Sequence, residues 1–133
     1  MDTPVLRTMR FDLIDNTYYG FEDFCVLQAK RTREKYDSSY EQIAKSIKNN
    51  LVGESTINLK PALFDYFKSL VVNVLLRNGD AHLKNYGLIY KDTSSIVNLA
   101  PIYDIVTTTA YLPKDIMALT LNGSKRWASR DDL

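Results

Sequence analysis

Polar side chains gather in one short stretch near the middle of the chain, from Asn78 to Asn85. The stretch reads Asn-Gly-Asp-Ala-His-Leu-Lys-Asn and contains the single histidine of the sequence, His82. Asp80 offers a carboxylate that can accept a proton, and Asn85 offers an amide oxygen of the kind that binds Mg²⁺. The stretch follows a strongly apolar segment and precedes two β-rich runs. We therefore expect a polar loop held between rigid elements, where functional residues tend to lie.

The spacing of these residues has a chemical meaning. In the protein-kinase catalytic loop, a catalytic Asp is followed five positions later by a magnesium-binding Asn, and Asp80 and Asn85 reproduce that interval. A second carboxylate, Asp104, ends the segment Pro101-Ile102-Tyr103-Asp104, where a kinase has a further metal ligand. Phosphoryl transfer needs charge neutralisation and a positioned hydroxyl, which one base and two oxygen ligands provide. The interval alone is a weak signal, and the second Asp makes it more specific.

Each of these residues also has a purely structural interpretation. Asp80 could be a turn residue or a helix N-cap, and Asp104 could cap the segment that follows it. Asn85 could satisfy backbone groups of its own loop. His82 suits a structural hydrogen bond as well as a phosphate contact, and Lys84 suits a solvated loop charge as well as a phosphate contact. The residue types by themselves leave these alternatives open.

Composition limits the classes of protein and of site. A chain of 133 residues and 15.3 kDa, 45% hydrophobic, is expected to form one soluble globular domain. Seventeen basic against sixteen acidic residues give a net charge of +1, so we expect no direct nucleic-acid binding. A single cysteine, Cys25, and a single histidine exclude a Cys/His metal site and leave oxygen ligands. The N-terminus has no signal-peptide pattern and no apolar run spans a membrane, so we expect a cytoplasmic protein.

Periodicity and turn residues predict the elements that position the loop. Two helices are predicted, over 39–49, with a capping box at Ser38 or Ser39, and from Leu59 to about residue 75, with Gly79 as its stop. A short helix is predicted at 21–29, and residues 50–58 are expected to form a connecting loop.

Strands are predicted before and after these helices. The segment 5–14 resembles one short strand that enters a turn at Asp15-Asn16. The runs 86–90 and 96–100 predict a hairpin across the polar residues 91–95, and 117–121 predicts a further strand closed by the turn Asn122-Gly123. The expected fold class is therefore α+β and mainly helical, with a short hairpin flanking the polar loop.

Several of these segments together resemble a known family. The segments 78–85 and 101–104 resemble the catalytic loop and metal-binding segment of the HipA-like kinases, the toxin halves of bacterial toxin–antitoxin pairs. Further stretches are similar in the same order: Arg10-Phe11-Asp12, Lys35-Tyr36, Leu119-Thr120-Leu121-Asn122-Gly123 and Arg130-Asp131-Asp132-Leu133. The resemblance implies a single domain over 1–133, part of a protein-kinase-like C-terminal lobe, with a hinge at 9–12.

The resemblance also implies roles for individual residues. Asp80 would be the catalytic base, and Asn85 and Asp104 would hold Mg²⁺. The hinge residues Met9, Arg10 and Phe11 would border the adenine of ATP. Near the nucleotide would also lie His82, Lys84 and Tyr103. Met9 departs from the family pattern, which often has Glu at that hinge position.

The function that the resemblance implies is serine/threonine phosphorylation. The ATP γ-phosphate would pass to a protein hydroxyl, with an aminoacyl-tRNA synthetase as a substrate and a small helix-turn-helix antitoxin as a partner. The five glycines are too dispersed for a Gly-rich phosphate loop, so we expect an isolated chain to be inactive without an N-terminal lobe supplied in cis or in trans. The alternatives are a non-catalytic binding module, one half of a split kinase, and a lipid-kinase-like phosphotransferase.

Overall fold

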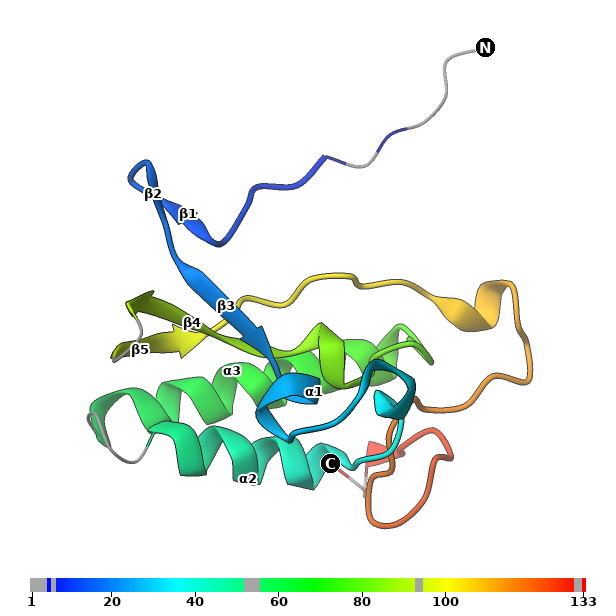
Figure 1. The fold of residues 1–133 in the computed structure, drawn as a ribbon. Coiled ribbons are helices and arrows are strands. Elements are labelled where there is room, and N and C mark those ends of the chain that lie inside the picture. Colours follow the sequence, from blue (N-terminus) through cyan, green and yellow to red (C-terminus); the bar gives the residue numbers. More distant parts are fainter. Residues whose placement is uncertain (1–4, 6, 52–55, 93–94, 131–132) are drawn as a thin grey trace.

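A small antiparallel sheet lies across a pair of long helices (Figure 1). The computed structural model describes residues 5, 7–51, 56–92, 95–130 and 133. The sheet has the strand order β3-β4-β5, formed by Gly20–Asp23, Gly87–Asp92 and Ser95–Leu99. The helices are α2, Tyr40–Leu51, and α3, Thr56–Leu75. The polar loop joins α3 to β4, so it is held between a helix and a strand, as predicted.

The hairpin of β4 and β5 is confirmed, with Leu88 opposite Leu99 and Ile89 opposite Asn98. Its connection is shorter than the predicted 91–95, because β4 continues to Asp92 and β5 begins at Ser95. Residues 93 and 94 lie outside the described part of the chain.

The helix predicted over 21–29 is mostly wrong. Residues 20–23 form β3, which pairs with β4, and only Phe24–Leu27 form a helix, α1. Gly87 of β4 leaves room for the Phe21 ring of β3, because a Cβ on Gly87 would lie 2.4 Å from that ring. Asp23 then begins α1 by accepting a hydrogen bond from the Val26 N–H at 3.0 Å.

The predicted strand over 5–14 is much shorter in the structure. Only β1, Leu13–Ile14, pairs, and its partner is β2, Thr17–Tyr18. The predicted turn is confirmed, because Asp15 and Asn16 both have a left-handed backbone, with φ of 48° and 61°, as a two-residue hairpin turn requires. The described residues before β1 have no strand partner; Phe11 packs on Tyr103 and Phe21, and the chain before residue 10 runs away from the body of the molecule (Figure 1).

Both long helices are confirmed, with corrected ends. Ser39, not Ser38, caps α2, because its Oγ accepts the Gln42 N–H at 3.1 Å. The loop expected at 50–58 is shorter, since α2 reaches Leu51 and α3 begins at Thr56; residues 52–55 lie outside the described part. At the other end, Gly79 does not stop α3.

The turn after α3 is made by Arg77. Its φ of 52° is left-handed, and the next N–H, that of Asn78, bonds the Asn73 carbonyl at 2.8 Å. This hydrogen bond across the helix end is the pattern of a Schellman C-cap.

The core lies between the sheet and the helices. From α2 and α3 it takes Ile43, Ile47, Ala62, Tyr66 and Leu70, joined by Phe24, Leu83, Leu88, Met117 and Leu119. Other apolar residues of α3 lie outside the face that packs in the core: Phe64 is 63% exposed and Leu75 is 73% exposed. The prediction that α3 is a core helix therefore holds for one side only.

The last part of the chain crosses the core with little regular structure. Residues 117–121 do not form the predicted strand; they make single bridges, Ser39 with Thr120 and Leu121 with Ser124. The predicted turn is confirmed, because Asn122 and Gly123 have φ of 50° and 74°. The fold class is thus α+β, with a long irregular segment after β5.

Candidate active site

The polar loop is anchored by its apolar residues. Leu83 and Ala81 are 0% and 1% exposed, and the Tyr40 hydroxyl of α2 donates to the Ala81 carbonyl at 3.2 Å. Leu83–Asn85 form one turn of 3₁₀ helix immediately before β4. Asp80 and Lys84 are the partly exposed side chains of this otherwise mostly buried loop, so the loop presents them from a fixed backbone.

Asp80 is the accessible carboxylate of the loop. Its side chain is 48% exposed. One oxygen, Oδ1, accepts a hydrogen bond from the Tyr36 hydroxyl and lies 3.9 Å from His82 Nε2. Asp80 also lines a pocket of about 450 Å³ whose other walls include Leu112, Ile116 and Lys125. A carboxylate placed in this way has room for a second molecule beside it.

Asn85 and Asp104 are in direct contact. The Asn85 amide Nδ2 donates to Asp104 Oδ2 at 2.8 Å, and the Asn85 Oδ1 accepts the His82 backbone N–H at 3.0 Å. Asn85 is buried, whereas Asp104 is exposed and has a left-handed φ of 56°. The Asp104 carboxylate therefore meets the amide nitrogen of Asn85, while the Asn85 amide oxygen faces the His82 backbone N–H.

This donor set fits one kind of magnesium site. In the part of the chain that the structure describes, no three His, Cys, Asp or Glu side chains come close enough to hold a metal ion. A closed protein cage is therefore not formed by these residues. Mg²⁺ is commonly held by one or two protein oxygens together with substrate phosphates, and Asn85 with Asp104 suits that arrangement.

Asn78 joins the two halves of the site, a role that the sequence reasoning missed. Its Oδ1 accepts the Asp80 backbone N–H at 3.1 Å, and its Nδ2 donates to the Asp104 carbonyl at 3.3 Å. The same Nδ2 donates to Asn73 Oδ1 of α3 at 2.7 Å, and Asn73 in turn donates to the Tyr86 hydroxyl at 3.2 Å. The position of Asn78 directly after an apolar helix was the available signal.

Lys84 and Tyr103 contact each other but not the exposed carboxylates. The Tyr103 hydroxyl donates to the Lys84 carbonyl at 2.6 Å, and the Lys84 ammonium bonds Asp23 at 3.0 Å. Burial raises the pKa of Tyr103 well above its ordinary value, so its hydroxyl stays protonated and remains a donor. Asp23 holds the Lys84 ammonium at the end of β3.

His82 is a buried, neutral residue. Its side chain is 8% exposed, and its Nδ1 is a buried atom without a hydrogen-bond partner in the structure. Burial lowers the pKa of His82, and the nearby charge of Lys35 lowers it further. The ring packs edge-on against Tyr36, with centroids 5.2 Å apart.

The three predicted hinge residues lie in different environments. Phe11 stacks on Tyr103, with centroids 5.3 Å apart and planes 26° apart, and also meets Phe21 edge-on. Met9 is 88% exposed, and Arg10 pairs with Asp12. The structure therefore brings Phe11 to the segment that ends at Asp104, and leaves Met9 and Arg10 in solvent.

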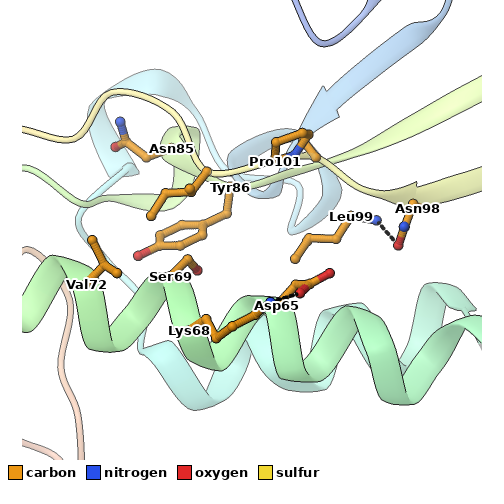
Figure 2. A pocket seen from close by; sticks show the side chains of 11 residues that line it. Asp65, Lys68, Ser69, Val72, Asn85, Tyr86, Asn98, Leu99 and Pro101 are labelled. Atoms are coloured by element: carbon orange, nitrogen blue, oxygen red, sulfur yellow. Dashed lines mark hydrogen bonds and ion pairs between the residues drawn. The ribbon is translucent and has the colours of Figure 1, made fainter. Parts of the chain in front are cut away.

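A second pocket, also of about 450 Å³, lies behind Asn85 (Figure 2). It separates α3, at Ser69 and Val72, from the end of β5, at Leu99, and from Pro101, which follows that strand. Neither Asp80 nor Asp104 lines it. Asn85, a predicted magnesium ligand, does line it, whereas the pocket beside Asp80 is lined by the predicted base.

The chain matches known proteins over nearly its whole length. The family model described as the HipA-like C-terminal domain matches residues 1–132, so the chain belongs to this family, as the sequence predicted. A Sinorhizobium fredii protein named "Putative kinase Y4dM" is 33% identical over 132 residues, which are 96% of this chain and 30% of the relative. A Haemophilus influenzae protein named "Putative kinase" is 40% identical over 73 residues, 55% of this chain and 20% of that protein.

The fold also matches a solved structure. It is similar to a chain in the Shewanella oneidensis MR-1 toxin–antitoxin complex of HipA, HipB and operator DNA, with a TM-score of 0.65 and 19% identity. The match covers 88% of this chain and 31% of that chain. The 133 residues thus span about a third of the length of two of these proteins and less of the third. Of the helices that the structure describes, none has the length and apolarity to cross a membrane.

Proposed function

We propose that this chain carries the catalytic base and the magnesium ligands of an ATP-dependent, HipA-like serine/threonine protein kinase. The observation that supports this most is the link made by Asn78, whose side chain bonds the backbones of both Asp80 and Asp104. With the Asn85–Asp104 contact, the three groups required by phosphoryl transfer form one connected site. The names of the curated relatives agree with this chemistry.

In the proposed reaction, Asp80 acts as the general base. The acceptor hydroxyl loses its proton to the Asp80 carboxylate while its oxygen bonds the γ-phosphorus of ATP and the bond to the ADP oxygen breaks. The exposed side chain and the adjoining pocket give an acceptor a way to reach this carboxylate. Asn78 fixes the backbone of Asp80, which places the Asp80 side chain where it can accept the proton of the attacking hydroxyl.

Asn85 and Asp104 are proposed to hold the metal, which when bound supplies positive charge that neutralises the phosphates. The His82 N–H fixes the Asn85 amide, and Asn85 in turn fixes the Asp104 carboxylate. These contacts pre-orient two oxygen-bearing side chains, as a phosphate-bridging site requires.

The nucleotide is proposed to lie between the metal segment and the hinge at 9–12. Phe11 and Tyr103 already stack there, and Lys84 and His82 lie on the loop between them and Asp80. Met9 and Arg10, exposed in this chain, are proposed to border the adenine with Phe11 once the rest of the cleft is present. We propose that a segment similar to the part of the longer relatives that this chain does not cover, supplied in cis or in trans, completes that cleft.

The biological setting is proposed from the family. We propose a cytoplasmic bacterial toxin whose acceptor is a protein hydroxyl, for instance on an aminoacyl-tRNA synthetase, and whose partner is a helix-turn-helix antitoxin. The Shewanella protein of similar fold is in complex with HipB and operator DNA, which supports an antitoxin partner.

The function is tested by phosphotransfer from γ-labelled ATP. The protein is expressed as its genome encodes it, with any residues that flank these 133, and is compared with Asp80→Ala. We expect label on a protein hydroxyl with the parent and none with Asp80→Ala. Equal activity in both would contradict the role of Asp80, and label on lipid alone would show a lipid-kinase-like phosphotransferase instead.

A second candidate is a non-catalytic binding module, or one half of a kinase completed in trans. It is favoured by the dispersed glycines, which form no phosphate loop, and by the 30% of Y4dM that the chain spans. Calorimetric titration of Mg·ATP into the 133-residue chain separates the cases. We expect weak or no binding to the chain alone. Binding at about micromolar Kd would show that these residues form a complete nucleotide site.

A further inference from the structure

The segment before α2 is fastened onto the polar loop. The Leu83 N–H donates to the Lys35 carbonyl at 3.1 Å, and the Tyr36 ring packs against His82. From the other side, the Lys125 ammonium donates to the Tyr36 carbonyl at 3.4 Å. The position of Tyr36 is therefore fixed by backbone, ring and charge contacts, independently of its hydroxyl.

The hydroxyl of Tyr36 bonds Asp80, the proposed base. It donates to Asp80 Oδ1, and Tyr36 and Asp80 line the same pocket. Burial and this hydrogen bond raise the pKa of Tyr36 to about 12, so the hydroxyl is protonated, and able to donate, throughout the physiological range. The contact joins residues 44 positions apart in the chain, and it depends on the fold rather than on local sequence.

We propose that Tyr36 is a positioning residue that sets the rotamer of the Asp80 carboxylate. A half-exposed aspartate rotates freely unless a donor holds one of its oxygens. With Oδ1 held by Tyr36, the carboxylate presents a defined face to an acceptor in the pocket. This inference rests on the proposed kinase function and adds a residue to it.

Effects of this kind have a known size. Removing a hydrogen-bond partner that orients a metal ligand typically lowers metal affinity or activity about 10- to 100-fold, and misplacing a reacting group costs activity on a similar scale. For Tyr36→Phe in the protein as encoded, we therefore expect kcat to fall by about that factor, with the KM for ATP unchanged. The phenylalanine ring keeps the packing against His82, so a role in structure alone would leave kcat at the parent level.

Tyr90→Phe is the matched control. The Tyr90 hydroxyl also donates to a carboxylate, Glu22 Oε2, at 3.1 Å, and burial together with that carboxylate raises its pKa to about 12 as well. This pair joins β4 to β3 and does not touch the loop. Tyr90→Phe should keep the kcat of the parent.

A spectroscopic readout tests the contact itself in the 133-residue chain. Tyr36 is followed by ¹³C-tyrosine NMR as the pH is raised, in the parent and in Asp80→Asn. Loss of the carboxylate should lower the Tyr36 pKa from about 12 toward its ordinary value of 10. An unchanged Tyr36 titration would overturn the contact and with it the proposal.

The outcomes separate this inference from the function on which it rests. An active parent with Asp80→Ala inactive and Tyr36→Phe as active as the parent would overturn the positioning role and leave the kinase function standing. A parent without phosphotransfer would overturn both. A fall in kcat equal in Tyr36→Phe and Tyr90→Phe would also overturn the positioning role, because it would show a general loss of structure.

Discussion

Asparagine side chains, rather than charges, hold the candidate site together. Asn73, Asn78 and Asn85 are 5%, 2% and 6% exposed, and each donates and accepts hydrogen bonds within the loop or to its neighbours. An amide offers both a donor and an acceptor without the cost of burying a charge. This suits a site in which the carboxylates themselves must remain available to ligands.

The first expectation concerns Asn78. In Asn78→Ala, the Asp80 N–H, the Asp104 carbonyl and Asn73 Oδ1 all lose their partner. We expect the free energy of unfolding to fall by about 2–4 kcal/mol, because one buried and two partly buried polar groups are left unpaired. Urea unfolding measures this. Asn50→Ala, which removes one bond within α2, should cost about 1 kcal/mol or less. An equal fall in the free energy of unfolding in the two variants would contradict a stabilising role of the Asn78 hydrogen bonds beyond that of a single helix bond.

The second expectation concerns acid stability and His82. Because burial lowers the pKa of His82 below its ordinary value of 6.5, the folded state favours the neutral ring. The stability contributed by the neutral ring is present above pH 6.5 and is lost as the pH falls toward the folded-state pKa, since the unfolded chain takes up the proton first.

The measurement is the free energy of unfolding between about pH 7 and pH 5. The parent should lose stability over this range more steeply than His82→Gln, which carries no group that titrates at this position. The carboxylates titrate in both proteins and cancel from the difference. Parallel curves would contradict a buried, neutral His82.

For single residues, the sequence identified the candidate side chains of the site but not their hydrogen-bond partners. The interval from Asp80 to Asn85 and the later Asp104 were visible as spacing, and the structure brings Asn85 into contact with Asp104. The bond from Tyr36 to Asp80 and the role of Asn78 were not predictable, because they depend on tertiary contacts that no local pattern encodes.

Among the elements, the irregular segment after β5 packs directly on the loop. The Gly79 N–H donates to Thr108 Oγ1 at 2.8 Å, and a Cβ on Gly79 would lie 2.1 Å from Asp115 Oδ2 and 2.7 Å from the Ile116 carbonyl. Gly79 is thus a place of close approach and not the helix stop that the sequence predicted. The pocket beside Asp80 takes its far wall from this segment.

The third expectation follows from that approach. Gly79→Ala should push residues 115 and 116 away from the loop and lower the free energy of unfolding by about 1–3 kcal/mol, as overpacking does. Gly20→Ala is the control, because its Cβ would meet the nearest atom, Tyr90 Cβ, at an ordinary 3.5 Å. Thermal unfolding of both variants measures the difference. A Gly79→Ala protein as stable as Gly20→Ala would contradict the close packing of the segment.

The elements with strong local patterns were predictable and the others were not. The helices α2 and α3 and the hairpin of β4 and β5 follow from periodicity and capping. Strand β3 was missed because it is defined by pairing with β4, far along the chain, and its own residues also suit a helix. The strand expected at 117–121 failed because Met117 and Leu119 are buried by packing against the helices, without a neighbouring strand.

The whole molecule leaves much apolar surface uncovered. Phe64, Leu75, Tyr111, Leu112 and Ile116 are each more than half exposed. A contiguous exposed apolar patch is typical of a surface that contacts another domain or protein, and Tyr111, Leu112 and Ile116 lie on one short segment of the chain. The chain spans 30% of Y4dM and 31% of the Shewanella chain of similar fold, and both of these proteins have further residues that could cover such a surface.

The most direct test of the central claim separates chemistry from binding at Asp80. Single-turnover transfer of the γ-phosphate and Mg·ATP affinity are measured for the protein as encoded and for Asp80→Asn, which keeps the size of the side chain and removes its basicity. We expect transfer to fall by at least about 100-fold while the ATP affinity changes little, as for the loss of a general base. Transfer at the parent rate in Asp80→Asn would contradict the claim that Asp80 is the base.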